Sequence, residues 1–212
     1  MINKKIQESS LNISSSVIGA LVGFAIGGPV GAVVSATASP AFTITHNIFN
    51  NVYERRKKRI TKVLDKALEI AKITPDETLL ILESNENKAD DLFSLLKMIV
   101  DTDPSIDLIL SSIIGENLKD TTSIHRDRLL ILSDAIRNMR SIHLRILKSI
   151  FNAGGVLSAE KMADESGIPI IELRSVVRDL ELRGMIRDTG KIPIEWELRE
   201  LGIMLLEFQM KK

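Results

Sequence analysis

The sequence predicts a mainly α-helical protein organised in three segments, residues 1–53, 54–140 and 141–212. In the middle segment, isoleucine and leucine recur at three- and four-residue intervals while glycine and proline are sparse, and only one short stretch near the C-terminus alternates between apolar and polar residues. Charge also divides the chain, because residues 1–59 carry a net charge of +5, residues 60–140 carry −5 and the remainder is neutral.

The N-terminal segment contains a long apolar run. No Asp, Glu, Lys or Arg occurs over Ser9–Tyr53, which is 45 residues. A bilayer core about 30 Å thick needs about 20 apolar helical residues, so the run is long enough for one membrane span or a short hairpin. Because proline lacks a backbone donor, we expect Gly28-Pro29 to interrupt the helix. The segment is therefore predicted to form a glycine-rich helical hairpin, with helices over residues 13–27 and 30–50.

Small residues recur at every fourth position of this run. On a helix, this spacing places them in one row, where two backbones approach closely, as in membrane helix association. Each glycine inside a helix costs about 1 kcal/mol relative to alanine, so the row needs a packing partner that offsets this cost. We expect a membrane-competent oligomerising segment; a soluble hairpin buried against the rest of the protein and a chance repetition are the alternatives. The residues assigned to this packing are Gly19, Gly23, Gly27, Gly31 and Ser35.

A basic cluster follows the apolar run. Cations at the end of an apolar segment are typical of a cytoplasmic membrane flank, and they attract anionic lipid headgroups. A solvated helix face and a nucleic-acid-binding patch are the alternatives, because the motif alone also fits them. The five residues of the basic cluster are Arg55, Arg56, Lys57, Lys58 and Arg59.

The middle segment is predicted to be an α-helical bundle. Apolar residues at helical spacing continue over Ile60–Ala71, and Thr74–Glu77 indicates a helix stop followed by a new start. Asp103-Pro104 supplies a further start signal. The remaining predicted helices of this segment cover residues 76–83, 87–101, 104–117 and 122–138.

The C-terminal segment predicts three helices, a hairpin and a last helix. The first helix carries Ile142, Ile146 and Ile150 on one face, and a short helix covers Glu160–Ser166. The third helix ends at Gly184, a residue type that commonly terminates helices. The residues of the third helix that are spaced to face a core are Leu173, Val176, Val177 and Leu180. A strand pair is expected around Asp188–Gly190. This order resembles the winged helix-turn-helix domains of bacterial regulators, and the resemblance implies that fold with a small β-wing.

Four basic residues of this segment are candidates for DNA binding. Arg174 and Arg178 share one face of the third helix, and Arg187 and Lys191 belong to the expected wing. DNA recognition needs base-reading side chains and cations that contact phosphates. The segment has eleven cations and eleven acids, however, and a neutral domain lacks most of the counterion-release drive. Two uses stay open, DNA binding and a protein-interaction or dimerisation use of the same fold.

The sequence predicts no enzyme, no cofactor, no catalytic residue and no metal site. No nucleophile elbow, phosphate-binding loop or zinc-protease motif occurs. The three histidines lie far apart in the sequence, and the lack of cysteine excludes disulfides and thiolate ligands. The cysteine content also fits a cytoplasmic protein.

Three motifs together resemble a loosely defined set of uncharacterised bacterial proteins. Gly27–Ala32 reads GGPVGA, Arg55–Arg59 follows as a basic run, and His143–Leu147 leads from a helical domain toward a winged helix. The set has no established activity, so the resemblance implies architecture alone. The row of small residues at every fourth position, a glycine zipper, is also similar to the glycine-zipper segments of membrane-permeabilising toxins and anti-phage effectors.

We therefore expect a non-enzymatic bacterial protein with a membrane-associating or self-assembling glycine-zipper head and a winged-helix interaction or sensing domain, and we consider a role in phage defence. The expected partners are further copies of the chain, inner-membrane lipid and a protein trigger; DNA is the weaker expectation. The expected location is the cytoplasm, in association with the inner membrane. The alternative is a winged-helix transcriptional regulator whose N-terminal hairpin serves for dimerisation.

Overall fold

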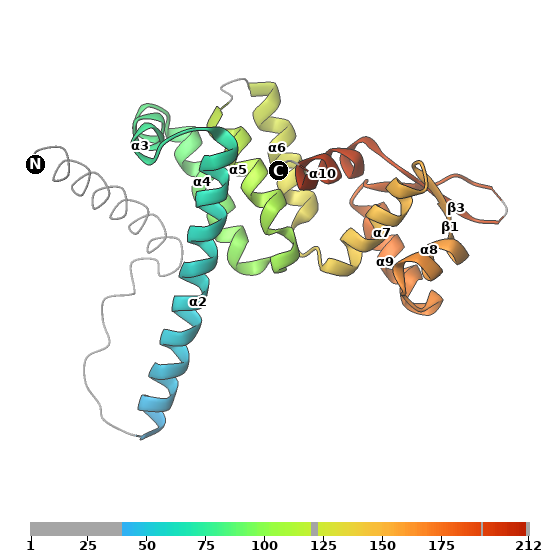
Figure 1. Cartoon of the computed structure of the whole chain (residues 1–212), viewed down its shortest axis with the longest axis horizontal. Helices are drawn as coiled ribbons and strands as arrows, with labels where there is room; N and C mark the ends of the chain where they lie inside the picture. Colours follow the sequence, from blue (N-terminus) through green and yellow to red (C-terminus); the bar gives the residue numbers. More distant parts are fainter. Residues whose placement is uncertain (1–39, 120–122, 192, 211–212) are drawn as a thin grey trace, which may run out of the picture. The chain divides into compact units, whose positions relative to one another are not determined.

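The computed structural model describes residues 40–119, 123–191 and 193–210. Within these ranges the protein is mainly α-helical, with nine α-helices, one 3-10 helix and a three-stranded antiparallel sheet near the C-terminus (Figure 1). The predicted mainly α fold class is therefore confirmed. The predicted helix over residues 13–27 and the small residues at positions 19 to 35 lie outside the described ranges.

Most predicted helices are present, with ends that differ by one to three residues. The elements are α2 (Pro40–Ala71), α3 (Pro75–Ser84), α4 (Glu86–Asp101), η2 (Pro104–Ile106), α5 (Asp107–Lys119), α6 (Ser123–Ile136), α7 (Ser141–Asn152), β1 (Val156–Ser158), α8 (Ala159–Ser166), α9 (Ile170–Leu182), β2 (Ile186–Asp188), β3 (Glu195–Leu198) and α10 (Glu200–Met210).

The chain divides into two compact units. The first unit contains the described residues up to Asp101 together with residues 114–119, and the second contains Thr102–Ile113 and the described residues from Ser123 onward. Helix α5 thus contributes to both units. The division into three segments that the sequence suggests stays a prediction.

The beginning of α5 belongs to the second unit because it is joined to α10. The Ser112 hydroxyl donates a hydrogen bond to the backbone carbonyl of Phe208 at 3.0 Å. Ser112 is fully buried, and Phe208 is 5% exposed. The hydrogen bond therefore satisfies a polar group inside the core of this unit.

Helix α2 is continuous over 32 residues and contains the basic cluster. The predicted end of the second hairpin helix at residue 50 is therefore wrong, because the helix continues to Ala71. The sequence boundary after residue 53 also falls inside this helix. Its C-terminal part is amphipathic as predicted, and Ile60 is the first of its described side chains that is buried. The buried apolar residues of this part are Ile60, Val63, Leu64, Ala67, Leu68 and Ala71.

In the first unit, α2 and the end of α5 approach closely at Gly115. A Cβ atom built on Gly115 would lie 2.8 Å from the carbonyl oxygen of Ala67 and 3.4 Å from a methyl group of Ile70. Because the nearest atom belongs to the backbone, it yields only if the helix itself moves. Glycine therefore allows a helix contact at this point that alanine does not.

Two helix starts that the sequence predicts differ in form. Thr74 and Glu77 form a capping box, in which each side chain accepts a hydrogen bond from the other's backbone N–H. At Asp103-Pro104, the side chain of Asp103 accepts from the Ser105 N–H at 2.9 Å, but the helix that follows is a 3-10 turn. The predicted α-helix over 104–117 accordingly begins later, at Asp107.

The sheet has the strand order β1-β3-β2, and both pairs are antiparallel. The predicted hairpin around Asp188–Gly190 is confirmed as β2 and β3, with Arg187 opposite Glu197. Strand β1 is not predicted from the sequence. It has three residues and pairs with β3, which follows about forty positions later, so no local pattern indicates it.

The helices of the second unit share one core with this sheet. Helix α7 packs against α8, α9 and β3. The buried side chains include Leu147 of α7, Met162 of α8 and Leu180 of α9, each 0% exposed. Of the predicted inward residues of α7, Ile146 and Ile150 are buried and Ile142 is half-buried, and all four predicted inward residues of α9 are buried.

We predict that Gly115→Ala lowers the free energy of unfolding by about 1–3 kcal/mol, because the added methyl group overpacks the contact between α2 and α5. Urea unfolding of the full chain, followed by circular dichroism, measures the change. Lys119→Ala is the control on the same helix, and we expect it to change stability by less than about 0.5 kcal/mol. The sign is diagnostic, since helix propensity alone makes alanine about 1 kcal/mol more favourable than glycine.

Candidate functional site

Helix α9 presents one face to the core and the opposite face to solvent. Its inward residues are Leu173, Val176, Val177 and Leu180, all buried. The helix ends before Gly184, whose φ of +71° is the left-handed conformation that favours glycine. This end of the helix confirms the stop that the sequence predicts.

The outer face of α9 carries the two arginines that the sequence assigns to DNA binding. Arg174 and Arg178 are both exposed and stand one helical turn apart. No acidic side chain in the described part of the chain forms an ion pair with either of them. Ile171, which is 84% exposed, and Leu182, which is 78% exposed, lie at the two ends of the same stripe. The outer face therefore carries two cations between two exposed apolar residues, and the exposed acid Glu181 lies one turn after Arg178.

The two cations of the β2–β3 hairpin are arranged differently. The guanidinium of Arg187 forms an ion pair with Glu197 on the facing strand, with an Nη2–Oε2 distance of 2.7 Å. The Lys191 ammonium lies 3.4 Å from the carboxylate of Glu195. Each cation is thus paired within the hairpin, and only Arg174 and Arg178 of the four predicted residues lie without an acidic partner among the described side chains.

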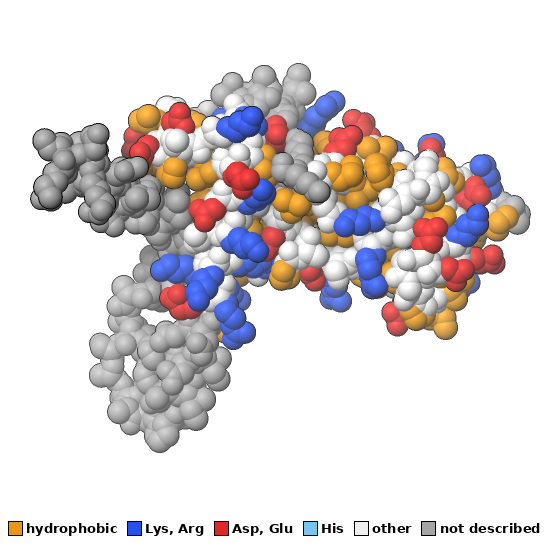
Figure 2. Space-filling model, in the orientation of Figure 1, with side chains coloured by type: hydrophobic (Ala, Val, Ile, Leu, Met, Phe, Trp, Pro, Cys, Tyr) orange, Lys and Arg blue, Asp and Glu red, His pale blue; other side chains and the backbone are white. Residues whose placement is uncertain are grey.

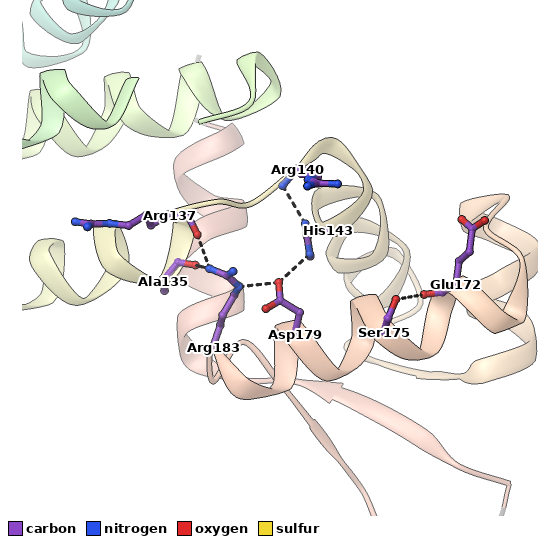
Figure 3. Close-up of polar contacts among 8 residues, drawn as sticks. All are labelled: Ala135, Arg137, Arg140, His143, Glu172, Ser175, Asp179 and Arg183. Carbon is purple, nitrogen blue, oxygen red and sulfur yellow. Dashed lines mark hydrogen bonds and ion pairs between the residues drawn. The ribbon is translucent and has the colours of Figure 1, made fainter. Parts of the chain in front are cut away.

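A polar cluster holds α9 in place (Figure 3). The carboxylate oxygen Oδ2 of Asp179 accepts hydrogen bonds from Nε2 of His143 on α7 and from Nε of Arg183, each at 2.9 Å. The guanidinium Nη1 of Arg183 also donates to the carbonyl oxygens of Ala135 and Arg137, at 2.9 and 2.6 Å. These bonds satisfy carbonyl groups at the end of α6 and fasten three helices together.

The sequence does not predict a role for Asp179, His143 or Arg183. The four-residue spacing of Asp179 and Arg183 is the only local signal, and it is common on solvated helices. His143 and Asp179 are 36 positions apart, so their contact depends on how α7 packs against α9.

The hydrogen bonds determine the tautomer of His143. Its Nδ1 accepts the backbone N–H of Arg140 at 2.9 Å, so Nδ1 carries no proton and Nε2–H donates to Asp179. Burial lowers the pKa of His143 below its ordinary value; the Asp179 carboxylate acts in the opposite direction, and the Arg183 guanidinium lowers the pKa further. The neutral imidazole is thus the form that fits this site.

The basic cluster lies on the part of α2 that precedes the core. Arg55, Arg56 and Lys58 are exposed, and Lys57 and Arg59 are half-buried. Successive residues of an α-helix are rotated by about 100°, so the five side chains of the cluster point in all directions around the helix axis. Figure 2 shows Lys and Arg side chains gathered along α2, whereas cations and acids alternate over the C-terminal helices. The basic cluster is a run of five consecutive cations.

No group of three or more His, Asp or Glu side chains in the described ranges could hold a metal ion. None of the helices in these ranges is long and apolar enough to cross a bilayer.

Comparison with family models, with curated protein sequences and with solved structures finds no match to this chain. The resemblance to uncharacterised bacterial proteins stays a prediction.

We predict that acidification from about pH 7.5 to about pH 5.5 lowers the free energy of unfolding, in part through His143. The pKa of the histidine side chain is about 6.5 in the unfolded chain and lower in the folded protein. The unfolded state therefore binds more protons just below pH 6.5, so the free energy of unfolding decreases as the pH decreases through this range. His143→Gln keeps an acceptor for Arg140 and a donor for Asp179 without titrating. Urea unfolding at both pH values should show a smaller loss for this variant; equal losses would contradict the prediction.

Proposed function

We propose that the protein is a non-enzymatic membrane-associating effector, whose N-terminal part attaches to an anionic membrane surface and self-assembles. The observation that carries the proposal is the basic cluster of α2. Its five cations are exposed or half-buried, and they precede the first buried residue, Ile60. In the same helix they follow a run without charged residues, from which Glu54 alone separates them.

The size of the electrostatic attraction supports this proposal. A Lys or Arg near an anionic leaflet contributes about 1 kcal/mol to binding. Because the five cations point around the helix, those that face the leaflet at one time supply about 2–3 kcal/mol in total. The attraction falls within about one Debye length, so it depends on salt and on anionic lipid.

We further propose that α7 to β3 form a winged helix that serves for protein interaction. The order of helices and strands supports the fold assignment. The paired hairpin cations, Arg187 and Lys191, and the exposed apolar residues Ile171 and Leu182 support protein interaction over DNA binding. A role as a cytoplasmic phage-defence effector at the inner membrane, released by a protein trigger, rests on the resemblance to glycine-zipper effectors.

We predict that the full chain sediments with vesicles rich in anionic lipid and not with neutral vesicles. Replacing the five cations of the basic cluster by glutamine should weaken binding at least tenfold, because most of the electrostatic attraction is lost. Added salt should weaken binding of the parent protein more than that of the variant.

The control removes the same number of exposed cations elsewhere and should bind within twofold of the parent. Its replaced residues are Lys148, Lys161, Arg174, Arg178 and Arg199. Equal binding to neutral vesicles, or equal loss in both variants, would contradict attachment through α2.

A DNA-binding regulator is the second candidate function. It is favoured by Arg174 and Arg178, which are exposed and form no ion pair with an acidic side chain among those that the structure describes. Two double variants are compared for binding to sheared genomic DNA at low salt: Arg174→Ala with Arg178→Ala, and the control Lys148→Ala with Lys161→Ala. Under our proposal, the first variant loses no more DNA affinity than the control. A gel-shift titration of the full chain measures this. Selective loss of more than tenfold in the first variant would favour the regulator, because base-reading side chains contribute about 1–3 kcal/mol each.

A further inference from the structure

An open pocket of about 390 Å³ lies in the second unit, between α6, the turn after α9 and the first turn of α10. Its charged walls are Arg128, Arg199 and Glu200, and its apolar walls include Ile131 and Met204. All of its lining residues are exposed or half-buried. The volume lies within the range of about 300–1,000 Å³ that is usual for ligand pockets.

Backbone contacts hold the first turn of α10 beside this pocket. The N–H of Arg199 donates to the Met185 carbonyl at 2.9 Å. A Cβ atom on Gly202 would lie 2.5 Å from the same carbonyl oxygen, so only glycine permits this approach. The pocket walls are therefore parts of the packed unit, although their side chains face solvent.

The charge of the pocket indicates the charge of its ligand. Arg128 and Arg199 are exposed, and neither forms an ion pair with an acidic side chain in the described ranges. Glu200 offsets one of the two positive charges. Guanidinium groups pair with carboxylates through two parallel hydrogen bonds, so the net positive wall favours a carboxylate.

The apolar part of the pocket also lacks a partner within the described chain. Ile131 is 60% exposed, although its neighbours Leu129 and Leu132 are buried. Leu201 and Met204 are half-buried beside it. Burying one large apolar side chain of a ligand here contributes about 1.5–3 kcal/mol.

We propose that this pocket binds a short acidic and apolar peptide segment of a partner protein. An aliphatic or aromatic side chain packs against Ile131, Leu201 and Met204, and an adjacent Asp or Glu carboxylate pairs with Arg128 or Arg199. Because no lining residue is buried, the pocket suits an anchoring side chain better than a free small molecule, which usually buries about 70–90% of its surface. This site is distinct from the basic cluster, so it does not depend on membrane attachment.

The test selects a yeast-displayed random peptide library on the full-length protein. We expect enrichment of peptides in which Asp or Glu stands beside Leu, Ile, Phe or Met. Fluorescence anisotropy should then show that Arg128→Gln with Arg199→Gln weakens the best peptide at least tenfold. Ile131→Ser should weaken it at least fivefold, and both variants should keep the parent circular dichroism spectrum, because the three side chains are exposed.

Lys148→Gln with Lys161→Gln is the matched control, since it removes the same charge from exposed positions of this unit outside the pocket, and it should bind within twofold of the parent. Replacing the acidic residue of the peptide by its amide should cost the parent protein at least fivefold in affinity. Enrichment without acidic residues, no enrichment, or equal losses in control and pocket variants would overturn the proposal. The proposal would also be overturned if decanoate displaced the labelled peptide at a lower concentration than the unlabelled peptide does, because the pocket would then prefer a fatty carboxylate.

Discussion

The second unit depends on one carboxylate, that of Asp179. It accepts hydrogen bonds from His143 on α7 and from Arg183 at the end of α9, and Arg183 in turn donates to two carbonyl groups at the end of α6. Without this carboxylate, the buried imidazole of His143 would lose the acceptor of its Nε2–H, and a buried polar group without a hydrogen bond lowers stability. The position of α9, and with it the direction of its outer face, therefore follows from this cluster.

The turn after α9 is the second point on which this unit depends. Gly184 adopts a conformation that few other residues tolerate, and the carbonyl of Met185 accepts the N–H of Arg199. The absent side chain of Gly202 lets α10 lie against the same carbonyl. One short turn thus ends α9, begins β2 and supports the wall of the pocket that we assign to a peptide.

Cations that look alike in the sequence have different surroundings in the structure. Arg187 and Lys191 are paired within the β2–β3 hairpin. Arg174 and Arg178 face solvent and form no ion pair among the described side chains, and the basic cluster precedes the buried part of α2. Local charge density favours a membrane surface for the basic cluster. On α9, the neighbouring Ile171 and Leu182 favour a protein partner. Residue type alone does not separate these uses, because the distances to neighbouring acids decide how much positive charge is available.

The sequence alone was sufficient to predict the mainly α fold class, the inward faces of α2, α7 and α9, the stop at Gly184 and the β2–β3 hairpin, because each depends on residues within one or two turns of each other. It also placed Arg174 and Arg178 on one face of α9. Only the tertiary structure decided that β1 pairs with β3, that Asp179 joins His143 to Arg183, that Gly115 lies against α2 and that Arg128 and Arg199 share a pocket. These contacts join residues that are distant in the chain or lie on different elements, and no helical or strand period encodes such distances.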